Sequence, residues 1–581
     1  MDMSKASLED VGLSLRRFGF VDYIVFVFML LICAVIGVYY GFCAGKVTAA
    51  EYLMGGRNMQ TFPVAMSLIA SFISGITLLG TPTEIYLYGT QYLYIAGGII
   101  GMAVIMGSAY LPVFHNLQLT STYEYLERRF DKNVRLFGSF LFTVTIITWL
   151  PIVIYVPALA FNQVTGINVH IITPAVCIVC IFYTCVGGLK AVVWTDVVQT
   201  IIMCGAIVLV VIKGTMDIGG LNVVWERNYV TGRIESPNFS MDPTVRHSVM
   251  SLTVGGGFYY LMLIGVAQDQ MQRYLTLPTV HAGRIALWTF VVGSLGIILL
   301  CSYSGLLIYA TYYDCDPLTT KLASAKDQLL PLLVMDTLKG IPGLPGLFVA
   351  GVFSAALSSM STGLNSMAAV VLEDFYKTWF LHQLSPRQTD ILMKSVVVIL
   401  GTICVALVFV VEHLGSVLQM SMSLSGVTHG SSLGIFSMGL FFPWVNSKCV
   451  LFGGISAMAF MSWVSLGTQA ALAAGDITFE TKPLSVEGCS YDFVTPASIV
   501  INSTIEDSTK EVFVLYRISY LWYTLLGTVV SMTVGLVASF ITGPKDPASV
   551  DPMLLSPVIR RFLPKKQTQD VDMALLNGYK L

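Results

Sequence analysis

Charged residues are scarce in this chain: Asp, Glu, Lys and Arg together make up 11% of its 581 residues. Soluble globular proteins carry about 25% of these residues, so the composition argues against a soluble enzyme. Intrinsic disorder is excluded as well, because it requires high charge and low hydrophobicity, whereas 55% of this chain is hydrophobic. The formal net charge of −2 provides no basic surface for nucleic acid, which is not expected as a partner.

The eleven cysteines form no regular framework of the kind found in small disulfide-rich secreted proteins. Cys177, Cys180 and Cys185 are spaced like metal ligands, but they lie in an apolar run without a nearby histidine or acid. We therefore expect small core residues there rather than a metal site. Cys315 and Cys489 lie in two polar loops, where they can form a disulfide or stay unpaired, and both alternatives remain open.

What the chain has in abundance is long apolar runs, of which thirteen approach the roughly 20 residues that a transmembrane helix needs. The run at 23–44 is too long for the apolar part of a signal peptide and lacks a small-residue cleavage site, so we expect it to be retained. The others lie at about 61–85, 91–112, 134–158, 168–188, 195–214, 246–266, 283–310, 341–370, 392–411, 417–442, 449–467 and 516–541. The sequence therefore predicts an all-α polytopic membrane protein with thirteen transmembrane helices.

The basic residues between these runs predict the orientation in the membrane. With residues 1–22 outside the cell, the inner segments and the tail at 542–581 hold 19 of the 32 Lys and Arg residues. Basic residues favour the cytoplasmic side, so we expect an extracellular N-terminus and a cytoplasmic C-terminus. Two glycosylation motifs, at Asn238 and Asn502, both fall in loops on the outer face, where alone they can be used.

Ten of the runs divide into two sets of five, at 61–214 and 246–442, once the first run and the last two, at 449–541, are set aside. Because each set crosses the membrane an odd number of times, the second set runs opposite to the first, which is an inverted repeat typical of secondary transporters. Both sets begin with a run rich in small residues, at 67–77 and at 255–257. Glycine costs about 1 kcal/mol in a helix, so we expect both helices to be interrupted there rather than merely closely packed.

The run at 341–370 presents a row of hydroxyl and amide side chains on one helical face: Ser354, Ser358, Ser361 and Asn365. Hydroxyl and carbonyl oxygens suffice to bind a monovalent cation without a carboxylate. Hydrogen bonds between neighbouring helices explain the same pattern equally well, so both interpretations stay open.

Ionisable residues are rare in the predicted spans. Glu84, Asp196, Asp269 and Arg273 are expected near span ends, which leaves no arginine ladder for a voltage sensor and no buried basic residue for an anion. His429 is the exception, because it lies within a span beside Ser431 and Ser432, and we expect it to be neutral and hydrogen-bonded.

Several motifs resemble the sodium/solute symporter family, in the branch of the iodide, monocarboxylate and multivitamin transporters. The resemblance covers roughly 20–541 and rests on the stretches at 51–57, 122–130, 158–166, 187–199, 269–274 and 365–374. It implies the ten-helix inverted-repeat fold of the leucine-transporter type.

The resemblance also implies two sites. A sodium ion would lie between the first and eighth helices of the repeat, bound by the carbonyls of Ala70, Ile73 and Ala355 and the hydroxyls of Ser358 and Ser359. A second site for sodium or substrate would include Ser74, Thr77, Tyr155, Ser421 and Met422. The iodide transporter looks to have a glutamine at the position of Thr77, and the stretch at 423–432 replaces the glycine–proline that is usual in the family. The second sodium and the identity of the cargo therefore stay open.

Together these observations predict a sodium-coupled symporter of the plasma membrane rather than an enzyme, since no nucleophile, acid pair or metal cluster stands out. The resemblance to this branch implies a small organic anion as the cargo, either a monocarboxylate or a carboxylated vitamin, moved by alternating access with sodium as the co-transported ion and the only metal. The alternatives are a sodium-coupled carrier of an inorganic anion or a sugar, and a solute sensor that does not transport. Besides the substrate, the lipid bilayer is the expected partner.

Overall fold

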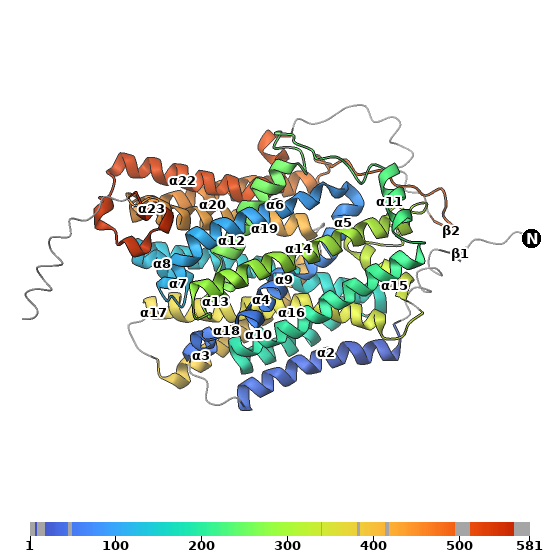
Figure 1. Cartoon of the computed structure of the whole chain (residues 1–581), viewed down its shortest axis with the longest axis horizontal. Helices are drawn as coiled ribbons and strands as arrows, with labels where there is room; N and C mark the ends of the chain where they lie inside the picture. Colours follow the sequence, from blue (N-terminus) through green and yellow to red (C-terminus); the bar gives the residue numbers. More distant parts are fainter. Residues whose placement is uncertain are drawn as a thin grey trace, which may run out of the picture.

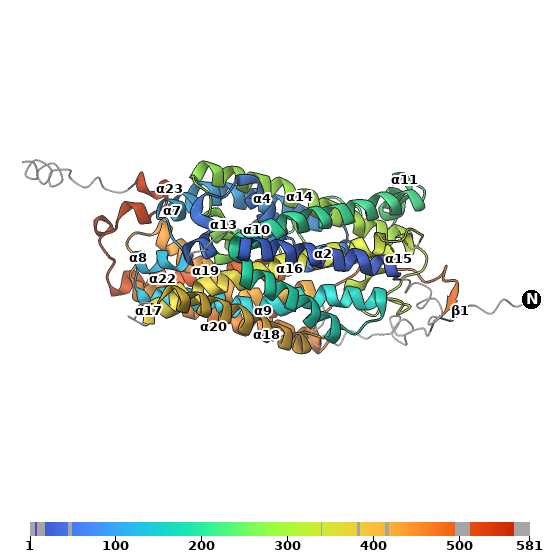
Figure 2. The ribbon, with the colours of Figure 1, turned by 90° about the horizontal axis from the view of Figure 1, so that it is seen from below.

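Long helices that run along one common direction dominate the computed structural model (Figures 1 and 2). The structure describes residues 6–7, 18–43, 49–338, 340–379, 384–412, 417–493 and 512–562, without the side chains of 6–7, 49–50, 417–420 and 422. The α-helices are α2 (Phe20–Val38), α3 (Ala49–Met54), α4 (Thr61–Phe72), α5 (Gly75–Tyr88), α6 (Ile95–Ile105), α7 (Leu111–Asn116), α8 (Thr122–Arg129), α9 (Lys132–Thr165), α10 (Val169–Asp217), α11 (Leu221–Val230), α12 (Gly256–Gly265), α13 (Gln268–Tyr274), α14 (Val280–Thr311), α15 (Leu329–Leu338), α16 (Leu344–Val370), α17 (Lys377–Trp379), α18 (Pro386–Val411), α19 (Val417–Phe441), α20 (Ser447–Ala473), α22 (Tyr523–Thr542) and α23 (Pro557–Arg560).

Shorter elements complete the described chain. The 3₁₀ turns are η2 (Gly55–Arg57), η3 (Thr90–Tyr94), η6 (Lys326–Gln328), η8 (Val514–Arg517), η9 (Tyr520–Trp522), η10 (Pro547–Ser549) and η11 (Pro552–Leu554). The π-helical turns are η1 (Tyr39–Cys43), η4 (Met106–Tyr110), η5 (Ser251–Gly255) and η7 (Val371–Tyr376). The strands β1 (Ala6–Ser7) and β2 (Tyr491–Asp492) form a two-residue parallel bridge.

In the described part of the chain, nine helical segments are long and apolar enough to cross a membrane, and eleven are when two bent pairs each count as one span. The pairs are α4 with α5, bent by 56°, and η5–α12 with α13, bent by 61°. The predicted run at 417–442 forms α19, which is not among the eleven. The predicted total of thirteen therefore stays a prediction, although the all-helical membrane architecture is confirmed.

Two predicted runs, 168–188 and 195–214, form the single helical element α10, which has 49 residues. As one straight helix with a rise of 1.5 Å per residue it would measure about 74 Å, more than twice the apolar thickness of a bilayer. Gly188 interrupts it with a left-handed conformation, φ 57° and ψ −158°. His170 near its start lies 3.0 Å from Glu412 beyond α18, whereas Lys190 in its middle lies 3.7 Å from Glu51 of α3. These contacts are at opposite ends of the bundle, so α10 doubles back at Gly188 and its two halves are separate crossings.

Different short helices lie at the two ends of the bundle. One end gathers α3, α8, α17 and α23, and the other gathers α11, α15 and the β1–β2 bridge (Figure 1). Cys315 and Cys489 form a disulfide near that bridge, which settles the pairing that the sequence left open. The exposed Asn238 belongs to the same end, whereas Asn502 lies outside the described residues. This arrangement agrees with the prediction that the loops containing Asn238, Cys315 and Cys489 lie on one face of the membrane.

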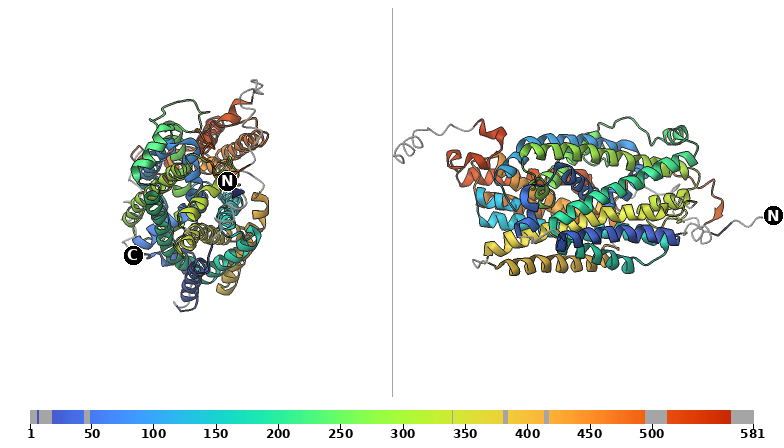
Figure 3. Two further views of the ribbon diagram at one scale, coloured as in Figure 1. Left: turned by 90° about the vertical axis from the view of Figure 1, so that its right-hand side faces the viewer. Right: turned by 60° about the horizontal axis from the view of Figure 1, so that its bottom comes forward.

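The helices of the bundle, seen along their axes in the left panel of Figure 3, differ in how far they are buried. In the span that contains α16, 94% of the apolar stretch is buried, against 28% in the span that contains α2. α16 is therefore enclosed by other helices, whereas α2 exposes apolar side chains such as Phe28 and Leu31 at the perimeter, as a lipid-facing helix does.

The predicted interruption at 255–257 is wrong in position. These glycines are helical, and the break of the second pair lies at Val266 and Ala267 instead. The glycines serve close packing: a Cβ on Gly255 would lie 2.6 Å from the carbonyl oxygen of Leu521, and one on Gly256 would lie 2.4 Å from Ile95 Cδ1. The alternative of packing through small residues therefore holds for this segment.

Candidate functional site

The break between α4 and α5 confirms the interruption predicted at 67–77. α4 ends at Phe72, Ile73 and Ser74 have extended ψ angles of 92° and 171°, and α5 begins at Gly75. The last carbonyls of a helix lack partners within it, so the break exposes main-chain oxygens around Ala70 in the buried interior. A Cβ on Gly75 would lie 2.9 Å from Pro157 Cγ, which shows how closely α9 approaches the break.

α16 meets α4 at this point through its serines. Ser359 Oγ donates to the main-chain oxygens of Ser71 and Ala355, each at 3.1 Å. Ser71 Oγ lies 3.2 Å from Ser358 Oγ and 2.8 Å from Thr362 Oγ1. The structure therefore brings the predicted residues of α4 and α16 to one place. All five predicted ligands are buried there: Ala70, Ile73, Ala355, Ser358 and Ser359.

A buried ion pair adjoins the serines, where the sequence predicted an interior nearly free of charge. Asp196 Oδ1 accepts from Ser358 Oγ at 2.6 Å, and its Oδ2 accepts from Ser67 Oγ at 2.5 Å. Arg273 Nη2 lies 3.0 Å from the same Oδ2 and also donates to Thr362. Asp196 is 0% and Arg273 1% exposed. Arg273 belongs to α13, which follows α12 after a bend of 61°, so the pair joins α10 to the second broken helix.

The orientation of these hydroxyls suits a cation. A hydroxyl has one donor and two acceptor lone pairs. Ser358 directs its proton to Asp196, and Ser359 directs its proton to carbonyl oxygens, so lone pairs of both remain available. The Asp196 carboxylate, which is paired with Arg273, fixes the orientation of the Ser358 hydroxyl. This set of hydroxyl and carbonyl oxygens fits an alkali cation, and the carboxylate that orients Ser358 beside it was missed by the sequence reasoning.

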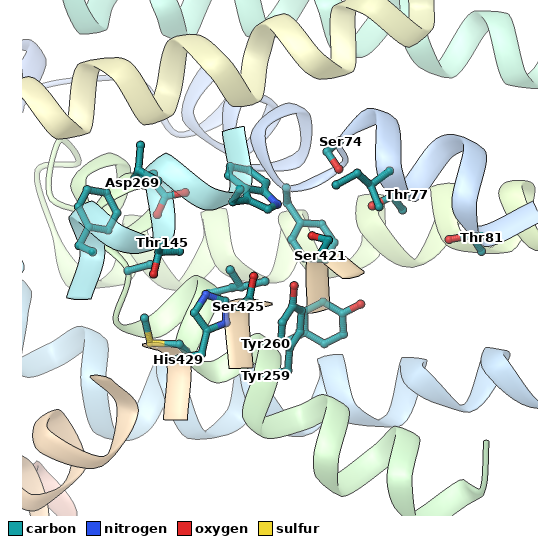
Figure 4. Close-up of a pocket in the computed structure, with 18 of the residues that line it drawn as sticks. Ser74, Thr77, Thr81, Thr145, Tyr259, Tyr260, Asp269, Ser421, Ser425 and His429 are labelled. Carbon is teal, nitrogen blue, oxygen red and sulfur yellow. The ribbon is translucent and has the colours of Figure 1, made fainter. Parts of the chain in front are cut away.

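A cavity adjoins the break and is lined by residues of α4, α5, η3, α9, α12, α13, α14 and α19 (Figure 4). Three of the five residues predicted for the second site line it, namely Ser74, Thr77 and Ser421. Tyr155 is buried in α9 but is not among the lining residues, and the side chain of Met422 lies outside the described part.

The cavity has polar residues that the sequence analysis did not assign to it. They are Thr81, Tyr92, Thr145, Tyr259, Tyr260, Asp269, Ser425 and His429. Ser421, Ser425 and His429 follow one another at intervals of four residues, which places them on one face of α19. That spacing was the available signal. The rest of the wall is mainly apolar and includes Phe72, Phe142, Ile146, Trp149, Leu263 and Ile298.

A cluster of ion pairs lies near each end of the bundle. At the end with the disulfide, Glu84 of α5 lies 2.7 Å from Arg246 and 3.1 Å from His247. Burial lowers the pKa of the Arg246 guanidinium, but the adjacent Glu84 raises it, and the net direction is upward. At the other end, Arg135 of α9 lies 2.6 Å from Asp374 of η7. Both clusters join helices of different predicted sets.

Comparison with known proteins gives consistent matches. The model of the sodium:solute symporter family matches residues 52–457. The sodium-coupled monocarboxylate transporter 1 of Homo sapiens is 40% identical over 536 residues, covering 90% of this chain and 87% of the relative. The sodium-dependent multivitamin transporter of Oryctolagus cuniculus is 36% identical, covering 94% of this chain and 86% of the relative.

Among solved structures, the substrate-bound outward-open state of a Na⁺-coupled sialic acid symporter superposes with a TM-score of 0.73 at 23% identity. The match covers 91% of this chain and 100% of that chain. The likeness establishes a shared fold, the leucine-transporter type that the sequence predicted.

Proposed function

Because this chain belongs to the sodium:solute symporter family, we propose that it is a sodium-coupled symporter that carries a small organic anion into the cell. The observation that carries the proposal is the broken α4–α5 helix, whose exposed carbonyls face the serine pair of α16. The relatives named above act on monocarboxylates and on vitamins, which supports either a monocarboxylate or a carboxylated vitamin as the cargo.

Sodium binds, in this proposal, between α4 and α16. Its ligands are the carbonyls of Ala70, Ile73 and Ala355 and the hydroxyls of Ser358 and Ser359. Asp196 holds Ser358 through a 2.6 Å hydrogen bond and adds negative charge beside the ion. Arg273 compensates that charge when the ion is absent, since its guanidinium lies 3.0 Å from Asp196.

Coupling follows from the position of the break. Sodium between α4 and α16 fixes the end of α4, and Phe72, Ser74 and Thr77 at the same break line the cavity. An ion that stabilises this geometry therefore raises the affinity for cargo, and by linkage the cargo raises the affinity for sodium equally. Each positive charge that moves inward across 100 mV contributes about 2.3 kcal/mol to uphill transport.

The second site remains part of the proposal, with Ser74, Thr77 and Ser421 as its residues for sodium or substrate. The two sets at 61–214 and 246–442 form the moving inverted repeats, and the helices at 23–44 and 449–541 flank them. The protein lies in the plasma membrane with its N-terminus outside, its tail at 542–581 inside, and a glycan on Asn238. The pairing of Ala6 with Tyr491 beside the disulfide supports this sidedness.

Radiolabelled uptake into cells or proteoliposomes tests the function. We expect uptake of at least one acid among lactate, nicotinate, biotin and pantothenate in sodium, and little uptake when choline replaces sodium. Uptake of only iodide or only glucose would establish one of the alternative carriers. Ligand binding without sodium-dependent flux of any compound in the panel would overturn transport in favour of a sensor.

A further inference from the structure

His429 is buried without a hydrogen-bond partner. Its side chain is 1% exposed, and neither Nδ1 nor Nε2 bonds to any atom of the described residues. The sequence predicted a hydrogen-bonded histidine beside Ser431 and Ser432, and this prediction is wrong. Ser431 Oγ donates instead to the carbonyl of Gly454, and Ser432 Oγ has no partner among the described residues.

Such an arrangement calls for a ligand. Most buried polar side-chain atoms in native proteins are hydrogen-bonded, and a buried group left unpaired is costly. His429 lines the cavity, and its ring centroid lies 5.5 Å from that of Tyr259, which also lines the cavity. Figure 4 shows the imidazole at the cavity wall next to Ser425 and Thr145. The missing partner therefore belongs in the cavity rather than in the protein wall.

The lining of the cavity limits what the partner can be. Among its described lining residues there is no Lys or Arg, and Asp269 is the one carboxylate. An anionic cargo must therefore be held by uncharged donors or by sodium. Imidazole has an N–H donor in either tautomer and in either protonation state. Asp269 repels an anion, and in the view of Figure 4 Thr145 lies between Asp269 and His429, while Tyr259 and Tyr260 lie on the other side of His429.

We propose that His429 donates a ring N–H to the carboxylate of the transported acid, with the Ser425 hydroxyl as the neighbouring donor on the same helical face. The apolar part of the acid then lies against the wall that includes Trp149 and Phe142. This inference rests on the proposed function and assigns the carboxylate end of the cargo to α19. His429 thereby acts as a substrate-binding and specificity-determining residue.

The test compares His429→Ala, His429→Phe and His429→Gln with wild type, using the best-transported acid among lactate, nicotinate, biotin and pantothenate. Ala removes the ring, Phe keeps a ring without an N–H, and Gln keeps an N–H donor. Ser432→Ala is the matched control, since Ser432 is buried and unpartnered on the same helix but does not line the cavity. Uptake is divided by the amount of protein at the cell surface.

We expect KM for the acid to rise by about tenfold or more in His429→Ala and His429→Phe, as for the loss of a hydrogen bond to a charged group. His429→Gln should stay within about threefold of wild type, and Ser432→Ala should match it. The sodium half-saturation concentration at saturating acid should be nearly unchanged in all variants.

Two results would overturn the assignment while leaving sodium-coupled transport intact: an unchanged KM in His429→Phe, or equal losses in His429→Phe and His429→Gln. The Phe and Gln variants preserve most of the side-chain volume, so they carry the test even if the Ala variant does not reach the surface. Wild-type protein that takes up none of the four acids would instead overturn the proposed function itself.

Discussion

Replacing the two serines of α16 separately tests the sodium site most sharply. Ser359→Ala removes a hydroxyl whose proton bonds the main-chain oxygens of Ser71 and Ala355 at 3.1 Å. The Ala355 carbonyl keeps its helical hydrogen bond, whereas the buried Ser71 carbonyl loses the bond from Ser359, so stability should fall by about 1–3 kcal/mol at most. Ser358→Ala removes a donor to Asp196, which retains Ser67 and Arg273 as partners. Both variants should therefore fold and reach the membrane.

The expected effect on sodium follows from the charge of the ion. A hydrogen bond to a charged group contributes about 1.5–3 kcal/mol, and we take the loss of one hydroxyl ligand to an ion to be of the same order. Since about 1.4 kcal/mol corresponds to tenfold in affinity, each variant should raise the sodium half-saturation concentration by roughly tenfold or more. The double variant should raise it by roughly a hundredfold or more.

The assay is uptake of a fixed concentration of acid as sodium is varied, with thermal stability in detergent measured on the same proteins. Ser354→Ala is the control, because Ser354 is buried and unpartnered one turn earlier on the same helix. It should show the sodium dependence of wild type. A wild-type sodium half-saturation in Ser359→Ala, with normal stability, would refute the placement of the ion between α4 and α16.

Three further outcomes are expected. Asp196→Asn leaves Arg273 buried without its carboxylate, which costs about 3–5 kcal/mol. The midpoint of thermal unfolding should therefore fall, and it should partly recover when Arg273→Gln is added. Equal midpoints for Asp196→Asn and wild type would contradict a buried ion pair. Cys315→Ser removes the disulfide and should lower stability by about 2–5 kcal/mol in thermal unfolding, whereas Cys43→Ser, at an exposed free cysteine, should not. Asn238→Gln should reduce the mobility shift that endoglycosidase produces, and adding Asn502→Gln should abolish it; an unchanged shift in Asn238→Gln would show that Asn238 carries no glycan.

The sequence predicted one helix break correctly and misplaced the other, although both segments carry the same local signal. Glycine permits either an irregular backbone or close approach of another chain segment. Gly75 lies at a true break, whereas Gly256 lies within a helix because Ile95 of α6 occupies the space where its Cβ would be. The deciding information is in the partner helix, and no local pattern contains it.

The charged residues of the site were missed for a related reason. Hydropathy identified the apolar runs and the row of serines on α16, because both are periodic within one segment. Asp196 and Arg273 are 77 residues apart and belong to different helices, and the helix of Arg273 follows a 61° bend in the chain. A run of apolar residues predicts that a helix crosses the membrane, but it does not predict where the helix bends or which charges then meet.

Each of the two broken helices has residues at both the proposed sodium site and the cavity. Coupling of sodium binding to cargo binding requires such a physical link between the two sites. In the first, the carbonyl of Ser71 accepts from Ser359 while Thr77 lines the cavity. In the second, Arg273 bonds Asp196, and its Nη1 donates to the main-chain oxygen of Asp269, whose side chain lines the cavity, at 2.8 Å.

A ligand shifts a conformational equilibrium only through contacts that differ between the two states. Since the two breaks belong to opposite predicted repeats, a sodium ion and an acid at these positions both stabilise one relative placement of the repeats. Either ligand alone stabilises part of that placement. Substitutions confined to α13 should therefore weaken the dependence of acid affinity on sodium, even where they touch neither ligand directly.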